Sequence, residues 1–206
     1  MCGMAQATST RRERERDIVE ATRALFDERG LQDAPVDEIA RAVGINKALI
    51  YRVFSSKEEL FVLTVTHYLD ELRELGRGVA DLRGALDEFT RFCLRYPAFL
   101  DCALSLMRRP ASELRERVGD GTWMRLGASM AACLAPLARI LEADGADDPD
   151  FLANRLYTHV LGTMHLARIG LGVCEAAPGV PAAFALDPER VRLACVEDAL
   201  RLAGAP

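Results

Sequence analysis

The chain has 206 residues, of which 50% are hydrophobic, 28% charged and 6% aromatic, and its formal net charge is −5. This composition excludes a disordered polyelectrolyte and supplies enough apolar residues for one sizeable core, or for a small domain and a larger one. The negative balance excludes nucleic-acid binding through bulk basicity, so any such binding needs local cations placed against phosphates.

The first two predicted elements are helices that follow a polar N-terminal segment. Residues 1–10 are predicted to be a flexible tail, after which Thr10 is suited to cap a helix over residues 11–28. Pro35 is suited to the first position of a second helix, over residues 36–43, because proline has no N–H to leave unsatisfied there.

Two further helices follow closely. Asn46 is predicted to cap a third helix over residues 47–54. Ser55 and Glu58 have the spacing of a capping box, which predicts the start of a fourth helix that continues to Leu75.

The turn between the second and third helices has the composition of a helix-turn-helix. Gly44 permits the positive φ that a tight turn needs, and Ala40 is small enough for the two helices to cross closely. A small core beneath them is predicted from five branched residues, Ile39, Val43, Ile45, Ile50 and Val53. Such a unit presents its second helix to the major groove of DNA.

Two segments of this region, ALFDERG and DEIARAVGINKALIYRVFSSKEELF, resemble the N-terminal DNA-binding domain of the TetR family of transcriptional regulators. The resemblance covers residues 12–65, and its most specific part runs from Gly44 to Leu60. It implies an all-α fold with a three-helix DNA-binding domain over residues 11–58. Residues 59–206 would form a helical bundle for ligand binding and dimerisation, giving about nine helices in all.

The third helix is the predicted recognition helix. Its early positions are the candidates for reaching base edges: Asn46, Lys47, Ala48 and Leu49. The resemblance implies phosphate contacts by Tyr51 and Lys57, assisted by Arg52, which would set register and affinity rather than sequence preference. The alternatives are half-buried packing for Tyr51 and a solvated side chain for Lys57. Lys47 and Lys57 are the only lysines of the chain.

One position departs from the family pattern. Members often carry Thr or Ser just before the second helix, where the hydroxyl caps the helix and contacts a phosphate. Here the segment is Ala34-Pro35-Val36, so only the backbone amide of Val36 is expected to serve as a phosphate donor.

The rest of the chain is predicted to be helical over residues 81–95, 97–108, 112–143, 150–171 and 188–203. An interruption is expected near Gly119–Gly121 and a kink at Pro136. Residues 172–186 contain two prolines and no helical or strand pattern, so they are predicted to form a loop. The apolar run from Leu156 to Val173 is interrupted by histidines, glycines and an arginine, so a buried helix is expected there and not a membrane span.

No catalytic or metal-binding constellation is found in the sequence, and no cofactor is predicted. His159 and His165 are six residues apart and do not share a helix face. The six cysteines lack metal-ligand spacing and are expected to be reduced in a cytoplasmic protein, with a redox-sensing Cys93–Cys102 pair as the alternative. An enzyme is therefore not expected.

The resemblance implies a pocket for a small apolar effector in the C-terminal part. Ten large or polar side chains are the candidates to line it: Phe89, Phe92, Phe99, Met107, Trp123, Met124, Tyr157, His159, Met164 and His165. A kink at Pro136 would keep the bundle from closing over such a pocket. The alternative is that these residues simply fill a core.

The last two helices are the candidates for a four-helix dimer interface, through Leu156, Val160, Ala167, Leu193, Val196 and Leu200. Burial of these residues within one chain is the alternative.

Together these patterns predict a cytoplasmic homodimeric repressor. It would bind double-stranded DNA at a pseudo-palindromic operator and be released by a small apolar effector, with no membrane partner. Two other readings stay open: a constitutive DNA-binding or partner-binding protein without an effector, and a helical enzyme or carrier with a vestigial DNA-binding domain.

Overall fold

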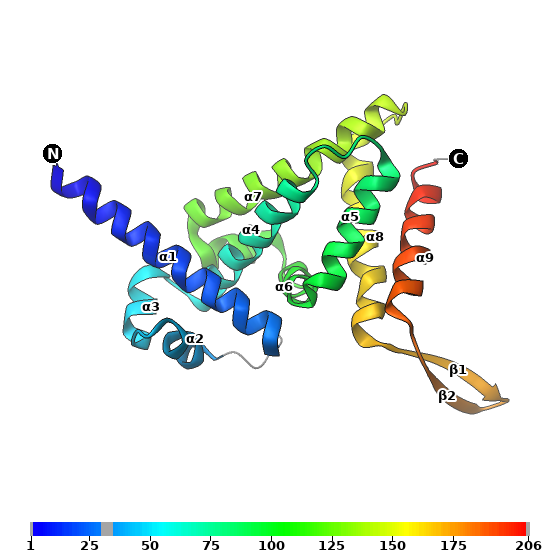
Figure 1. The fold of residues 1–206 in the computed structure, drawn as a ribbon, viewed down its shortest axis with the longest axis horizontal. Helices are drawn as coiled ribbons and strands as arrows, with labels where there is room; N and C mark the ends of the chain where they lie inside the picture. Colours follow the sequence, from blue (N-terminus) through cyan, green and yellow to red (C-terminus); the bar gives the residue numbers. More distant parts are fainter. Residues whose placement is uncertain (1, 30–34, 205–206) are drawn as a thin grey trace. The chain divides into compact units, whose positions relative to one another are not determined.

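The computed structural model describes residues 2–29 and 35–204, which are almost wholly helical (Figure 1). In chain order the elements are α1 (Cys2–Arg29), α2 (Val36–Val43), α3 (Lys47–Val53), α4 (Lys57–Leu75), α5 (Leu82–Arg95), α6 (Pro97–Met107), α7 (Ala111–Ala143), α8 (Pro149–Ile169), β1 (Leu171–Ala177), β2 (Val180–Ala185) and α9 (Pro188–Leu202). The predicted helical fold is confirmed, with one hairpin added to it.

The chain forms two compact units. The first comprises residues 1–69 and 101–129, and the second comprises residues 70–100 and 130–206. One boundary falls inside α4, so the start of this helix belongs to the first unit and its last turns belong to the second. The functional division predicted between residues 58 and 59 stays a prediction.

The core of the first unit lies beneath the helix-turn-helix. Its buried residues are Ile18, Val19, Val36, Ile39, Ala40, Ile50, Phe54, Leu60 and Leu63, and Val43, Ile45 and Val53 pack against them. All five residues predicted for this small core therefore take part in it. Because one apolar face of each short helix meets the others here, the positions that remain exposed on α3 are determined by this packing.

Three local predictions in the first unit need correction. Helix α1 begins at Cys2, so residues 2–10 are helical and Thr10 does not mark a helix start. Pro35 is the N-cap of α2, one position before the predicted one. The capping interaction of α4 is shifted by one residue: the Ser56 hydroxyl accepts from the Glu59 amide at 3.0 Å, and Ser55 donates to the Glu59 carboxylate. Two overlapping Ser-x-x-Glu spacings occur in this segment, and the sequence alone does not separate them.

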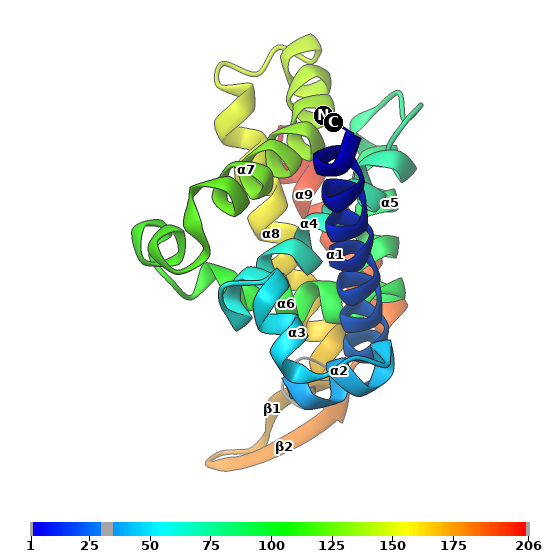
Figure 2. The same cartoon turned by 90° about the vertical axis from the view of Figure 1, so that its left-hand side faces the viewer.

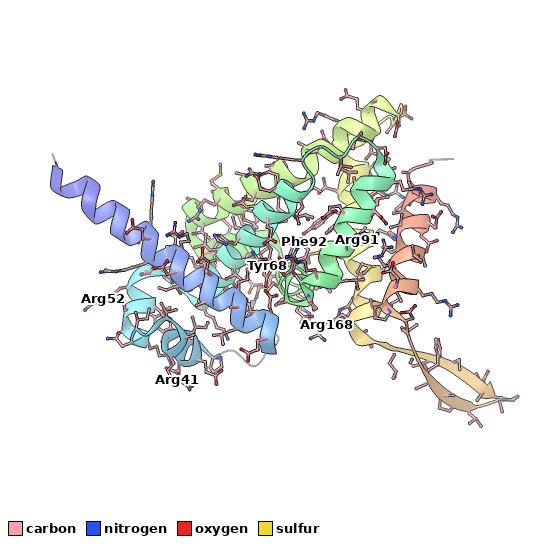
Figure 3. The ribbon with its side chains drawn as sticks, viewed as in Figure 1. Arg41, Arg52, Tyr68, Arg91, Phe92 and Arg168 are labelled. Atoms are coloured by element: carbon pink, nitrogen blue, oxygen red, sulfur yellow. The ribbon has the colours of Figure 1, made fainter. Side chains whose placement is uncertain are left out.

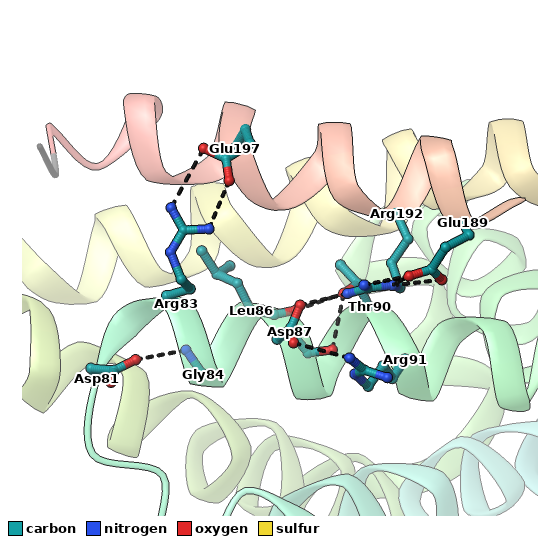
Figure 4. A network of polar contacts seen from close by, with 10 residues as sticks. All are labelled: Asp81, Arg83, Gly84, Leu86, Asp87, Thr90, Arg91, Glu189, Arg192 and Glu197. Atoms are coloured by element: carbon teal, nitrogen blue, oxygen red, sulfur yellow. Dashed lines mark hydrogen bonds and ion pairs between the residues drawn. The ribbon is translucent and has the colours of Figure 1, made fainter.

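The second unit is built around α5, α8 and α9, which pack against one another. A polar network joins α5 to α9 (Figure 4): Arg192 donates to Asp87 and Glu189, and Arg83 pairs with Glu197 at 2.7 Å. The Arg192 side chain is only 4% exposed, so its charge is largely removed from water and depends on these carboxylates.

The segment after α8 is an antiparallel hairpin, so the loop predicted for residues 172–186 is wrong. Strand β1 pairs with β2 from Leu171↔Ala185 to Ala177↔Val180, with an irregularity between Glu175 and Ala177. The hairpin extends beyond the ends of α8 and α9 that it connects (Figures 1 and 2). No alternation was visible in the sequence because nearly all residues of both strands are exposed, leaving no buried face to create it.

Helix α7 contains the predicted interruption, since Gly119 has φ 75° and ψ 159°. The helix continues through Pro136 without another residue in a non-helical conformation. By length and composition, α7 is the single helix within the described residues that could cross a membrane, and 22% of its apolar window is buried within the chain.

Candidate nucleic-acid interface

Helices α2 and α3 form the predicted helix-turn-helix around Gly44, which has φ 71° and caps α2. The amide of Ile45 bonds to the carbonyl of Ala40 at 2.9 Å and closes the turn. Burial of Ile50 fixes the rotation of α3 about its axis, so that the opposite side faces solvent. Its exposed side chains are those of Lys47, Ala48, Tyr51 and Arg52.

Most of the predicted DNA-contacting side chains are therefore on the surface. Leu49 is half-buried, and the Val36 side chain is buried in the core, so Val36 can offer only its backbone amide. Tyr51 is 47% exposed, which is more than a purely packed ring would be. Arg41 of α2 and Arg52 of α3 extend into solvent (Figure 3).

Asn46 has a structural task at the start of α3. Its side-chain oxygen accepts a hydrogen bond from the Leu49 amide at 2.8 Å, which confirms the predicted cap. This oxygen is thereby committed to the helix, and Asn46 positions the residues that follow it.

Lys47 is joined to α2 through an ion pair. Its Nζ lies 3.0 Å from the Asp37 carboxylate, and both side chains are at least half exposed. The hydrogen bond to Asp37, followed by the charge of that carboxylate, raises the pKa of Lys47 above its usual value. Asp37 thus holds the ammonium group in place, and it also puts a negative charge where a phosphate or base would approach.

Lys57 is the first residue of α4, and its Nζ lies 5.3 Å from the centroid of the Phe61 ring. This distance is within the range of a cation–π interaction, which leaves the ammonium group at the surface. The N-terminal end of the α4 dipole adds positive potential at the same place.

The start of α4 is tied to the first half of α7 within the same unit. The Ser56 hydroxyl donates to the carbonyl of Arg117 at 3.1 Å, and Thr122 donates to the Glu59 carboxylate at 2.8 Å. Although burial acts to raise the pKa of Glu59, hydrogen bonds from Ser55 and Thr122 outweigh it, and the pKa lies below its usual value. Glu59 therefore stays ionised and holds the turn that carries Lys57.

The local charge differs from that of the whole chain. Residues 35–57 contain four cations, Arg41, Lys47, Arg52 and Lys57, and two carboxylates, Asp37 and Glu38, giving a net of +2 in a chain whose net charge is −5. Glu38 pairs with Arg41 at 3.6 Å. Sequence reasoning missed the roles of Asp37, Glu59 and Thr122, because each depends on contacts between separate helices. It also missed Arg41, whose ion pair with Glu38 lies within α2.

The residues predicted for an effector pocket do not gather at one place. The second unit has a cavity of about 80 Å³, and of the ten candidates only Phe89 and Tyr157 line it. Their rings stack, with centroids 5.4 Å apart. Polar groups that the sequence did not point to also line the cavity, including Arg73, Glu88 and Cys133, together with Pro136. Burial raises the pKa of the Cys133 thiol to about 11.

The other candidates lie elsewhere. Phe92, Phe99 and Met164 are fully buried core residues of the second unit. Met107, Trp123 and Met124 belong to the first unit, where Met107 and Met124 are exposed and Trp123 packs beside Leu114 and Val118. His159 and His165 each have a buried ring nitrogen without a hydrogen-bond partner among the described residues.

The residues predicted for a dimer interface are mostly used within the chain. Leu156, Val160, Val196 and Leu200 are buried, Ala167 is half-buried, and Leu193 is exposed. Besides Leu193, the large apolar side chains of α8 and α9 that face solvent are ones that were not predicted, namely Phe151, Leu166, Ile169 and Leu202.

Among the described residues, neither the cysteines nor a metal-binding cluster contributes to the candidate nucleic-acid interface. Cys93 and Cys102 are unbonded and buried, they belong to different units, and burial raises the pKa of both thiols. Among residues 2–29 and 35–204, no group of three or more His, Cys, Asp or Glu side chains could hold a metal ion.

Comparison with known proteins matches the first unit most strongly. The profile described as bacterial regulatory proteins, tetR family, matches residues 18–63. The transcriptional activator FasR of Mycolicibacterium smegmatis is 34% identical over 90 residues, which are 40% of this chain and 41% of FasR. The chain thus matches less than half the length of this relative.

Solved structures extend the likeness over the whole fold. A TetR-family transcriptional regulator from Streptomyces coelicolor aligns with a TM-score of 0.61 at 18% identity, covering 93% of this chain and 80% of that one. A transcriptional regulator from Saccharomonospora viridis in complex with choline aligns with a TM-score of 0.55 at 20% identity, covering 92% and 96%. At these identities the likeness concerns the fold alone.

Proposed function

Because the chain belongs to the TetR family of bacterial regulatory proteins, we propose that it regulates transcription by placing α3 in the major groove of operator DNA. The observation that carries this proposal is the exposed side of α3. Lys47, Ala48, Tyr51 and Arg52 face solvent there, over a buried Ile50 and next to Lys57 of α4. An enzyme that kept only a vestigial domain would have no reason to keep these cations exposed on a chain of net negative charge.

In this proposal the DNA contacts fall into two groups, those to bases and those to phosphates. Lys47 and Ala48, with Asn46 and Leu49 beside them, approach base edges, Lys47 as a donor to guanine and Ala48 through a thymine methyl group. Tyr51, Arg52, Lys57 and the backbone amide of Val36 bind phosphates and set the register.

The regulator acts as a homodimer in this proposal. Two copies of α3 would enter successive major grooves of a pseudo-palindrome, with half-sites about 34 Å apart. The exposed side of α8 and α9 is the surface best suited to self-association, because it carries large apolar side chains that are exposed among the described residues, including Phe151, Leu166 and Ile169. Binding over a promoter would repress transcription.

A small effector would enter the cavity of the second unit. Apolar walls from α4, α5, α7 and α8 surround Arg73, Glu88 and Tyr157, so that a mostly apolar molecule with one polar group would fit the lining. Leu72 and Gly76, at the end of α4, line this cavity, while Lys57 begins the same helix. A shift of α4 would therefore reach the DNA contact, and coupling of about 1–3 kcal/mol would be enough for induction.

One observation favours a second candidate, a regulator without an effector. The cavity of about 80 Å³ is smaller than the roughly 300–1,000 Å³ of ordinary ligand sites, so an effector would have to widen it. Thermal unfolding in the presence of a library of small amphipathic molecules separates the candidates. A compound that raises the Tm and releases DNA supports the effector, and a chain that no compound stabilises supports constitutive binding.

The experiment that tests DNA binding is a titration of promoter DNA from around the protein's own coding region. Wild type is compared with a Tyr51→Ala/Lys57→Ala double variant and with Arg139→Ala, which removes an exposed cation from α7 of the second unit. Losing Lys57 as one phosphate contact should reduce the slope of log Kd against log salt by about 1.

Selective binding by wild type and Arg139→Ala, with at least tenfold weaker binding by the double variant, supports the proposal. Equal binding by all three proteins would place the DNA contact elsewhere. If wild type selects no sequence, even from a random DNA pool, the DNA-binding proposal is overturned. A reporter gene placed behind the bound site then distinguishes repression from activation.

A further inference from the structure

The β1–β2 hairpin is an apolar projection that none of the described residues covers. Val173 is 73% exposed and Phe184 is 46% exposed, and Leu171 and Val180 are each about half exposed. Within residues 171–186 the single charged side chain is Glu175, which accepts a hydrogen bond from the Gly179 amide at the tip. An isolated two-stranded hairpin is only marginally stable in water, so this one needs a surface to pack on.

The hairpin is nevertheless built as a defined element. Pro178 and Gly179 form its turn, and Gly179 has φ 76°, as the third position of a type II turn requires. The Phe184 ring lies over Gly172, where a Cβ atom would approach ring atoms to 2.4–2.8 Å. This close contact fixes the pairing register.

The exposed side of α8 has a shallow groove that runs along the N-terminal half of the helix, away from the hairpin. Phe151, Arg155, Thr158, His159 and Gly162 line it, together with the end of α9 at Leu202, around a volume of about 520 Å³. Phe151 is 61% exposed, and the buried Nε2 of His159 has no hydrogen-bond partner among the described residues. The groove thus offers a largely apolar floor to a partner.

We propose that the hairpin of one copy packs into this groove of a second copy, and that the exchange is reciprocal. The inference rests on the dimer proposed above and assigns its contacts. The groove is centred near residue 157 of α8, and the hairpin follows Ile169 at the end of the same helix. At 1.5 Å per residue, the centre of the groove and the start of the hairpin are about 18 Å apart along the helix axis. A two-fold axis close to the C-terminal end of α8 therefore brings both hairpins onto both grooves at once.

The residues at that axis fit the arrangement. Leu166 and Ile169 are exposed on the last turns of α8, where the two copies of this helix would cross. Gly162 leaves space at the edge of the groove, since nothing lies within 4 Å of a Cβ atom built there. The interface would consequently be isologous, with the same residues buried on both copies.

Charge argues for a second copy over other occupants. Residues 171–186 contain no Lys or Arg to meet nucleic acid or anionic lipid, and no Trp or Tyr to anchor in a membrane interface. In the proposed dimer each hairpin contributes one glutamate, Glu175, whose carboxylate is bonded to the Gly179 amide at the hairpin tip. Charge repulsion between the two hairpins is therefore small.

The test uses Cys174, an exposed cysteine of β1, as a natural reporter. A groove cysteine is introduced as Thr158→Cys in a Cys2→Ser background, with Ala128→Cys on the exposed side of α7 as the matched control. Oxidation should link Thr158→Cys chains into a covalent dimer on a non-reducing gel. Neither Ala128→Cys nor the Thr158→Cys/Cys174→Ser double variant should do so.

Sedimentation separates failure of this inference from failure of the dimer itself. Phe184 lies on the same face of the hairpin as Cys174, so Phe184→Asp should weaken dimerisation at least tenfold, while Ala128→Asp should leave it unchanged. A wild-type dimer without the Cys174 cross-link, and insensitive to Phe184→Asp, would overturn the hairpin exchange and leave the proposed dimer intact. A monomeric wild type would overturn both the proposed dimer and the hairpin exchange. The proposed DNA contacts of α3 would not be affected by that result.

Discussion

In the proposed DNA contact, Lys47 and Asp37 are the pair of residues with most influence on how α3 would meet DNA. The carboxylate of Asp37 holds the Lys47 ammonium group at 3.0 Å and raises its pKa, so that Lys47 is positioned and charged before DNA arrives. The same carboxylate must then share that ammonium group with a phosphate or a base. Exposed pairs of this kind contribute little to stability, so the effect of Asp37 should appear in DNA binding.

We expect Asp37→Asn to tighten DNA binding severalfold, because it removes a negative charge from the interface and frees Lys47. Fluorescence anisotropy at fixed ionic strength measures the change. Glu38→Gln is the matched control, since it removes the same charge from the neighbouring residue, which pairs with Arg41 and not with Lys47. Weaker binding by Asp37→Asn would show instead that Asp37 is needed to hold Lys47 in position.

At the scale of the element, the turn between α2 and α3 depends on the conformation of one residue. Gly44 has φ 71°, and open space surrounds the place where a side chain would begin. Gly44→Ala should therefore cost about 1 kcal/mol of unfolding free energy through backbone strain alone. Gly127→Ala in α7 also meets open space, but without a positive φ, and should stabilise by about 0.5–1 kcal/mol.

Urea denaturation of the two alanine variants measures both effects. The opposite signs matter, because the two substitutions add the same methyl group in similarly open surroundings. If Gly44→Ala left the unfolding free energy unchanged, the turn would accommodate an alanine without strain. The positive φ of Gly44 would then not be what holds α3 in place. DNA affinity of the Gly44→Ala variant should fall as well, since α3 would be displaced from its place on α2.

Helices of this chain could be predicted from sequence where local chemistry marks their ends. Asn46, Asp81 and Asp187 each cap a helix that begins directly after them, and Pro149 and Pro188 occupy first helical positions. The solvent-exposed positions of α3 followed from the same reasoning, because the buried residues of a short amphipathic helix leave only one side exposed.

The hairpin and the cavity could not be predicted in the same way. Alternation identifies a strand only when one of its faces is buried, and β1 and β2 lack such a face in the single chain. Pro178-Gly179 was the available signal, as a turn dipeptide between two apolar runs. The cavity depends on which sides of four helices meet, so Arg73 and Glu88 gave no sign of lining it.

For the whole molecule, the α5–α9 network predicts how stability depends on pH. Hydrogen bonds from Arg192 overcome the effect of burial on Asp87, and they directly lower the pKa of Glu189, so both carboxyl groups have pKa values below their usual ones. In the unfolded chain these groups bind protons more readily. The stability that they confer is therefore complete above about pH 5 and is lost as the pH falls through the folded pKa values.

We expect Asp87→Asn to lower the unfolding free energy at pH 7 by about 2 kcal/mol, because the buried guanidinium of Arg192 loses a charged partner. Between pH 5 and 3 the variant should lose less stability than wild type does. Urea titrations across this range measure both quantities. Asp198→Asn, which removes a surface partner of Arg201, is the control and should change neither. Parallel pH curves for wild type and Asp87→Asn would contradict the assignment.

The pairing of Lys47 with Asp37 also affects how fast acylation can occur at one of the two lysines. The two lysines of the chain both lie beside the proposed DNA contact, so acetyl donors can neutralise side-chain amines only at that contact. Since the raised pKa of Lys47 keeps its amine protonated and poorly nucleophilic, acetylation there should be slow while Asp37 is present. Bound DNA would shield both amines, and mass spectrometry of briefly acetylated protein would report operator occupancy without any label.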